Sequence, residues 1–176
     1  MDLKNTKLIF LYKTFIFKKT TFKTSKEELK NIVTALNIKD RKKRIKYIYE
    51  ETIKYLNNYY SNDFCKFINN QCIAQRLNKV SDINGCCKHC KNVGSKGCTT
   101  SNIGCKLIYC KTSIKNFKLI KLKEIPILKC FSLRQKLILK MDVMCKKEEI
   151  LKDLNYGIIY SSLRNFIKDI THKFKK

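Results

Sequence analysis

Apolar side chains recur three and four residues apart along much of this chain, which is the spacing of one face of an α-helix. A first predicted helix begins after Ser25, a favourable N-cap residue, and ends near Asn37. Its apolar face consists of Leu29, Ile32, Val33 and Leu36. A longer helix begins after Asp40, which can cap it in the same way. Its expected buried stripe consists of Ile45, Ile48, Tyr49, Thr52, Ile53 and Leu56.

Helical spacing returns in the last third of the chain. Residues 114–121 fit either a helix or a short strand, and Pro126, the only proline, interrupts both alternatives. A further helix begins near Ser132 and carries a stripe of Leu133, Leu137, Met141 and Met144. A short helix over Lys147–Leu154 stops at Gly157. The last amphipathic helix carries Ile159, Leu163, Phe166, Ile167, Ile170 and Phe174.

The pattern predicts a mainly α fold, a small helical domain with an irregular Cys-rich loop. A chain of 176 residues is the usual size of one domain. Residues 24–176 are expected to form it, with the Cys-rich loop at residues 85–110. Residues 1–23 alternate apolar and basic side chains and form an N-terminal arm that fits an edge strand, a membrane-surface segment or a disordered arm.

The N-terminal residues do not have the pattern of an export signal. Lys13 divides their apolar stretch, and no small-residue cleavage site follows Lys18 and Lys19. No apolar run approaches the roughly 20 residues that span a bilayer. We therefore predict a cytoplasmic protein without a transmembrane segment, in which cysteines stay reduced and a Cys cluster favours a metal or redox site.

Six cysteines within 25 residues are the strongest chemical signal in the sequence. They are Cys86, Cys87, Cys90, Cys98, Cys105 and Cys110. One possible ligand set pairs the C-x2-C of Cys87 and Cys90 with the C-x4-C of Cys105 and Cys110. Another combines Cys86, Cys90, Cys98 and one later cysteine. The spacing predicts a metal-binding loop and leaves the ligand set open.

Three further residues are secondary ligand candidates. His89 lies between the cysteines of the C-x2-C pair. Cys65 and Cys72 are seven residues apart, so on a helix their sulfurs would lie ~10 Å apart along the axis, too far to share one ion. Cys130 and Cys145 are interpreted as core thiols.

Glycines accompany the cysteines of this loop. Gly85, Gly94, Gly97 and Gly104 are four of the five glycines in the chain, and they permit the positive-φ turns with which a loop wraps an ion. Thiolate-rich tetrahedral sites suit Zn²⁺ or an iron–sulfur cluster such as 4Fe-4S. We predict Zn²⁺ first, with an iron–sulfur or thiol redox protein as the alternative.

The net charge of +25 favours polyanionic partners. Five cations gather at the start of the second predicted helix, namely Arg41, Lys42, Lys43, Arg44 and Lys46. Cations at a helix N-terminus oppose the helix dipole, and a bound phosphate would reverse that penalty. The sequence therefore predicts either a nucleic-acid-binding surface or a solvated basic face.

The sequence carries few signs of catalysis. It contains neither a Gly-rich phosphate loop nor a G-x-S-x-G or H-E-x-x-H motif. Its main functional hypothesis is a non-catalytic metal-binding module. A nucleic-acid-binding regulator that uses basic helices is the second hypothesis.

Five segments carry a family resemblance: RKKRIKYIYEETIKYLNN, NNQCIAQR, NGCCKHCK, KGCTT and CKLIYC. They resemble a family of small cysteine-cluster proteins of low-G+C Gram-positive bacteria, and the likeness covers residues 41–176. That resemblance implies a C-x2-C type cluster but no assigned reaction. A second likeness is to bacterial proteins that chelate zinc or iron with a C-x2-C-x2/3-C-C motif. Here the adjacent pair Cys86–Cys87 precedes the C-x2-C instead of closing the motif.

Overall fold

The computed structural model describes residues 25–59, 93–94, 97–98, 102–107, 120–161, 163–164 and 167, together with residues 68 and 71. These residues are mainly helical, as predicted. The N-terminal arm of residues 1–23 lies outside them. In the described part of the chain no helix is both long and apolar enough to cross a membrane.

The first two helices begin where the sequence predicts. Helix α2 spans Lys26–Asn37, and helix α3 spans Arg41–Tyr59. Ser25 Oγ accepts the N–H of Glu28 at 3.2 Å, and the Glu28 carboxylate accepts the N–H of Ser25 at 2.6 Å, a reciprocal cap. Asp40 Oδ1 accepts the N–H of Lys43 at 2.7 Å. Both predicted N-cap residues are therefore confirmed.

Short elements follow α3. Strands β1 (Val93–Gly94) and β2 (Gly97–Cys98) form a two-stranded antiparallel ladder. Helix α5 spans Ile103–Leu107. The 3₁₀-helices η2 (Leu122–Glu124) and η3 (Pro126–Cys130) come next, with Pro126 in the first turn of η3, where its missing N–H costs no hydrogen bond.

Helices α7 (Leu133–Met141) and α8 (Lys147–Tyr156) complete the named elements. Ser132 caps α7 together with Gln135, which agrees with the predicted start of this helix near Ser132. Gly157 ends α8 in the left-handed conformation, at φ 71°. The stop predicted at Gly157 is thus confirmed, and residues 160, 161, 163, 164 and 167 are helical again.

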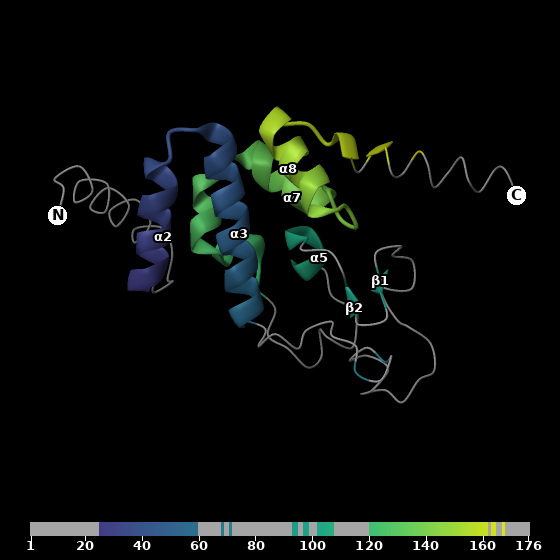
Figure 1. Ribbon diagram of the computed structural model, residues 1–176, viewed down its shortest axis with the longest axis horizontal. Helices are drawn as coiled ribbons and strands as arrows, with labels where there is room; N and C mark the ends of the chain where they lie inside the picture. Colours follow the sequence, from purple (N-terminus) through teal and green to yellow (C-terminus); the bar gives the residue numbers. More distant parts are fainter. Residues whose placement is uncertain are drawn as a thin grey trace, which may run out of the picture.

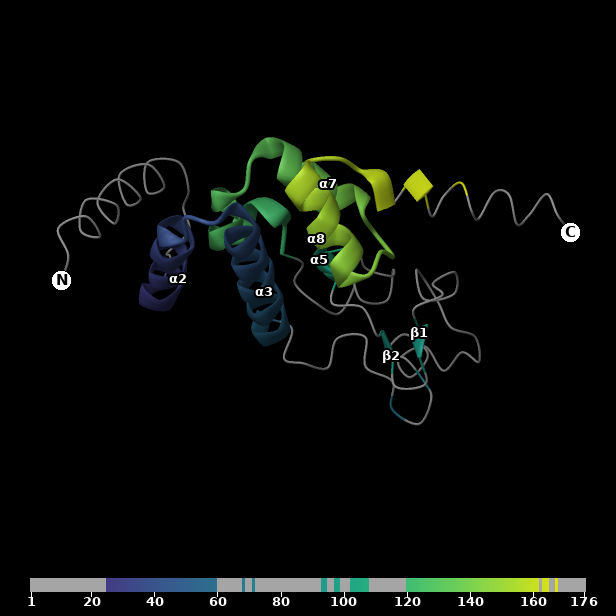
Figure 2. The same cartoon turned by 45° about the horizontal axis from the view of Figure 1, so that its top comes forward.

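Helix α3 is the centre of the fold. It packs against α2 and η3 on one side and against α5 and α8 on the other, and α7 in turn contacts α5 and α8. Figures 1 and 2 show α3 between α2 and the pair α7–α8, with β1 and β2 set apart from the helices. Its buried side chains are Ile45, Ile48, Tyr49, Thr52 and Leu56, which is the predicted stripe apart from the partly buried Ile53.

Other predicted apolar positions face outward. Leu36 on α2 is 40% exposed, and Leu133 on α7 is 85% exposed. The side chains of α7 that enter the core are instead Ile138 and Leu139. On the last helical segment Leu163 and Ile167 are also exposed. Helical spacing located α2 and the start of α7, but it extended the stripe of α7 to Met144, beyond its end at Met141, and did not identify which apolar face packs. Phe166, Ile170 and Phe174 of the predicted last helix lie outside the described residues.

Candidate metal centre

Among the predicted metal ligands, Cys105 is the one whose side chain the structure describes. Cys98 is described through its backbone in β2. The remaining predicted ligands, Cys65, Cys72, Cys86, Cys87, His89, Cys90 and Cys110, lie outside the described residues. Within the described residues, no three His, Cys, Asp or Glu side chains are grouped to hold a metal ion.

The β1–β2 ladder reverses the chain between the predicted ligand pairs. Val93 pairs with Cys98 and Gly94 with Gly97, so only two residues separate the strands. The backbone of Cys98 consequently lies opposite a residue three positions after Cys90. Paired strands of this kind have backbones about 5 Å apart, so the backbone of the predicted ligand Cys98 lies about that far from the backbone of Val93.

Asn102 fixes the end of the Cys-rich segment to the helical core. Its Oδ1 accepts the N–H of Cys105 at 2.9 Å and so caps α5. Its Nδ2 donates to the carbonyl oxygens of Asp142 at 2.7 Å and Cys145 at 2.9 Å. Asn102 is fully buried, so each of these hydrogen bonds replaces water that the group has lost. One side chain thereby joins α5 to the connection between α7 and α8.

Gly104 permits this close packing in a different way from the one predicted. It lies inside α5, not in a positive-φ turn. A Cβ atom at this position would stand 2.4 Å from the carbonyl oxygen of Leu139 on α7. The missing side chain therefore lets α5 contact the backbone of α7, and the interpretation of Gly104 as a turn residue was wrong.

The Cys105 sulfur is held by the same connection. It accepts the backbone N–H of Met144 at 3.0 Å, and Met144 adopts a positive φ of 63° to present that donor. A positive φ is uncommon for a residue with a side chain, so the surrounding contacts must maintain it. The N–H of Met144 therefore orients the Cys105 sulfur relative to the helical core. Thiolate is the form in which cysteine binds metals.

Tyr49 of α3 brings a buried hydroxyl group close to this position. Burial raises the pKa of Tyr49 well above its ordinary value, and the nearby Cys105 acts in the same direction. A hydrogen bond with the backbone of Ile103 opposes the shift. The phenol therefore stays neutral, and α3, α5 and the α7–α8 connection meet around Cys105.

The two predicted core thiols differ from Cys105 in their surroundings. Cys145 is fully buried, and Cys130 is partly buried against the hydrophobic core. Burial raises the pKa of Cys130 to about 11, although the cations of Lys136 and Arg44 oppose this. Cys130 is thus a protonated thiol at neutral pH, and the interpretation of both residues as core thiols is confirmed.

The chain between Cys65 and Cys72 is not helical at Ile68 and Gln71. These two residues form an isolated antiparallel bridge, with both N–H···O distances at 3.0 Å. The separation of ~10 Å between the Cys65 and Cys72 sulfurs, which assumes a continuous helix, therefore does not apply to this segment. Cys65 and Cys72 stay predicted as secondary ligands.

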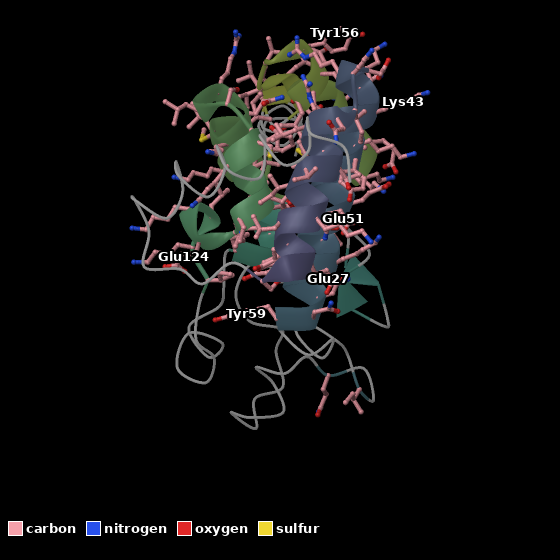
Figure 3. All side chains as sticks on the ribbon, turned by 90° about the vertical axis from the view of Figure 1, so that its left-hand side faces the viewer. Glu27, Lys43, Glu51, Tyr59, Glu124 and Tyr156 are labelled. Atoms are coloured by element: carbon pink, nitrogen blue, oxygen red, sulfur yellow. The ribbon has the colours of Figure 1, made fainter. Side chains whose placement is uncertain are left out.

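The basic start of α3 is mostly exposed. Arg41, Lys42, Lys43 and Lys46 are exposed, whereas Arg44 is half-buried and its Nη1 donates to the carbonyl oxygen of Ile38 at 3.5 Å. Figure 3 shows Lys43 extending outward from its end of the molecule. Four of the five predicted cations are accordingly available to a partner, and Arg44 is partly occupied within the fold.

Comparison with known proteins found no match: no family model fits the chain, and no curated protein or solved structure is similar to it. The resemblance to small cysteine-cluster proteins stays a prediction.

Asn102 and Gly104 are the residues whose roles were not foreseen. Asn is a preferred N-cap residue, and Asn102 stands directly before Ile103, so a local signal for α5 was present. The contacts of Asn102 with Asp142 and Cys145 bridge 40 and 43 residues. Local sequence contains no sign of such distant partners.

Proposed function

We propose that this protein binds a metal ion, Zn²⁺ first, through thiolates of the Cys-rich segment, and that Cys105 is a ligand anchored to the helical core. The observation that supports this most is the backbone N–H of Met144 directed at the Cys105 sulfur at 3.0 Å. The clamp formed by Asn102 holds the same helix in place. A ligand oriented before the metal arrives loses less conformational freedom on binding.

The remaining ligands would come from Cys86, Cys87, Cys90, Cys98 and Cys110, with Cys65, Cys72 and His89 as secondary candidates. The β1–β2 ladder supports this assignment because it pairs the backbone of Cys98 with that of Val93, which follows Cys90 by three residues in the sequence. Four thiolates would close the shell of a structural Zn²⁺ and leave no open position for substrate. The proposed role is therefore non-catalytic.

Two single variants test the role of Cys105. We expect Cys105→Ser to lower the metal content and metal affinity of protein purified without chelator, because serine is a poor zinc ligand. Cys130→Ser is the matched control, since that thiol is protonated and packed against the core. Elemental analysis of aerobic and anaerobic preparations measures both. Less than one equivalent of metal in both preparations of the unchanged protein, or equal metal content in the two variants, would contradict the proposal.

The absorbance spectrum distinguishes the metals. A colourless protein containing zinc supports the zinc site, whereas a brown band near ~400 nm in anaerobic protein supports the iron–sulfur alternative. Reversible metal loss on mild oxidation would indicate the thiol redox alternative.

A second proposed function is nucleic-acid binding through the start of α3. It is supported by the exposure of Arg41, Lys42, Lys43 and Lys46, whose positive charge exceeds that of the one carboxylate at the N-cap, Asp40. Changing these four residues to Gln should weaken binding to a labelled oligonucleotide and reduce its salt dependence between ~50 and ~200 mM.

The matched control for this variant removes the same charge elsewhere. Lys121, Lys123, Lys146 and Lys152 are also exposed, and their replacement by Gln lowers the net charge equally. Equal losses of binding in the two variants would mean that general charge, not the start of α3, attracts the oligonucleotide.

A further inference from the structure

Exposed apolar side chains are concentrated in one region of the described chain. Eight of the eleven large apolar side chains that are exposed among the described residues lie between residues 133 and 167. They are Leu133, Leu137, Met141, Tyr156, Ile158, Tyr160, Leu163 and Ile167. Single exposed apolar residues are ordinary, but a concentration of this kind indicates an interaction surface.

Helix α7 is apolar on two faces. Ile138 and Leu139 enter the core, whereas Leu133, Leu137 and Met141 are 85%, 52% and 49% exposed. The three exposed residues are spaced by four, so they form one stripe along the helix. We call Leu133, Leu137 and Met141 the α7 stripe.

Cations border the α7 stripe on both sides. With 3.6 residues per turn, Arg134 lies on one side of the stripe around the helix, and Lys136 and Lys140 lie on the opposite side. The sequence of α7 contains no acidic residue. Lys136 also lies close enough to Lys129 to contribute to the lowering of its pKa, behind the larger effect of burial. The surroundings of the stripe are therefore positively charged.

The apolar surface continues beyond α7. The side chain of Arg134 lies beside Gly157, where a Cβ atom would meet its Nε at 3.4 Å. Gly157 separates Tyr156 from Ile158, which are 70% and 44% exposed. Tyr160 follows, and the Cζ of Arg164, whose guanidinium is also paired with the Glu149 carboxylate, lies over its ring at 6.0 Å from the ring centre. Exposed tyrosines and cations beside aliphatic side chains are the composition that favours the interface of a lipid bilayer.

Three partners could cover this surface: a second copy of the chain, a nucleic acid or a membrane. Their charge and shape favour the membrane. A second copy of the chain would bring another net charge of +25 against the cations that border the stripe. A nucleic acid would contact the cations but would leave Leu133 and Leu137 in water, since phosphates offer no apolar surface. The side chains of the stripe protrude from α7 into solvent. A fluid bilayer can accept protruding side chains without a matching cleft. An anionic membrane surface satisfies both the charge and the apolar side chains.

We propose that the α7 stripe, together with the exposed side chains of Tyr156, Ile158 and Tyr160, docks this protein onto an anionic lipid surface. In the docked state the aliphatic side chains of the stripe enter the level of the headgroups. The cations of Arg134, Lys136 and Lys140 contact lipid phosphates. This binding is peripheral and does not depend on the metal proposed for Cys105.

Co-sedimentation with vesicles tests the docking surface. The full chain should bind vesicles of phosphatidylcholine mixed with phosphatidylglycerol and should bind pure phosphatidylcholine far less. The double variant Leu133→Gln/Leu137→Gln keeps every charge and should lower binding to the anionic vesicles about tenfold, since affinity follows the apolar area inserted. Leu36→Gln on α2 is the matched control, because Leu36 is exposed but lies outside the stripe.

Three results would overturn the proposed membrane docking. Equal binding by the double variant and the Leu36 variant would mean that charge alone adsorbs the protein to vesicles. A change from dimer to monomer in the double variant would assign the stripe to self-association. Loss of oligonucleotide binding without loss of vesicle binding would assign it to a nucleic-acid surface. Circular dichroism of both variants verifies that they are folded.

Discussion

Asn102 is the residue on which the most buried hydrogen bonds of the candidate site converge. It caps α5 and donates to two carbonyl oxygens of the α7–α8 connection, those of Asp142 and Cys145. Both of these residues are fully buried. Removing the amide would leave their carbonyl groups without this donor in a place that water does not reach.

Asn102→Ala should therefore destabilise the protein strongly. The lost cap costs about 1 kcal/mol and each deprived carbonyl about 1–3 kcal/mol, so we expect a loss of about 3 kcal/mol or more. Urea unfolding followed by circular dichroism measures it. Ser132→Ala is the control, because it removes an exposed cap on α7 and should cost about 1 kcal/mol. Equal losses in the two variants would show that the clamp adds little.

Cys105 shows the limit of prediction at this scale. Its identity as a candidate ligand followed from spacing alone. Its hydrogen bond with Met144 joins residues 39 positions apart, and no local pattern marks that contact. Spacing in the sequence identified six cysteines as candidate metal ligands, but it could not show that the helical core holds the sulfur of Cys105.

At the scale of elements, local signals located the helices. Ser25, Asp40 and Ser132 mark the starts of α2, α3 and α7, and Gly157 marks the end of α8. These signals are readable because a cap acts on backbone groups only two or three residues away. Which face of α7 packs was not readable, because Ile138 and Leu137 are equally apolar.

The contact between α5 and α7 predicts that a Gly-to-Ala substitution within a helix lowers the free energy of unfolding instead of raising it. Replacing Gly by Ala within a helix normally stabilises it by about 1 kcal/mol. Gly104→Ala should instead destabilise the protein by about 1–3 kcal/mol, since the new Cβ would stand 2.4 Å from the Leu139 carbonyl oxygen. Urea unfolding would reveal the sign. Asn58→Ala, at an exposed position on α3, should be neutral or slightly stabilising.

For the whole molecule, ion pairs between helices connect stability to pH. Lys147 Nζ on α8 lies 2.8 Å from Glu50 Oε1 on α3. This hydrogen bond, more than any other contact, holds the pKa of Glu50 below its ordinary value of 4.5. The ionised carboxylate therefore stabilises the folded state above pH 4.5, and the contribution disappears as the pH falls through the lowered pKa.

Glu50→Gln should accordingly destabilise the protein near pH 7 and have little effect in acid. We expect a loss below about 1 kcal/mol, since both side chains are about one third exposed and water screens the pair. Urea unfolding at several pH values measures it, and Lys147→Gln with the double variant isolates the pair. A Glu50 effect that is unchanged in acid would exclude this ion pair as its cause.

The clamp at Asn102 also has a consequence for the metal site proposed above. Helix α3 ends at Tyr59, and Asn102 is hydrogen-bonded to the α7–α8 connection, so the helical core holds the chain at both of these positions, which flank residues 60–101 in the sequence. Any sulfur in that segment meets Cys105 as part of the same molecule. Two binding groups joined in one chain have an effective concentration for each other that reaches the millimolar range for short flexible connections. In the metal site proposed above, the thiolates of one chain would close the metal shell, so metal affinity should not depend on protein concentration when the free metal concentration is held constant.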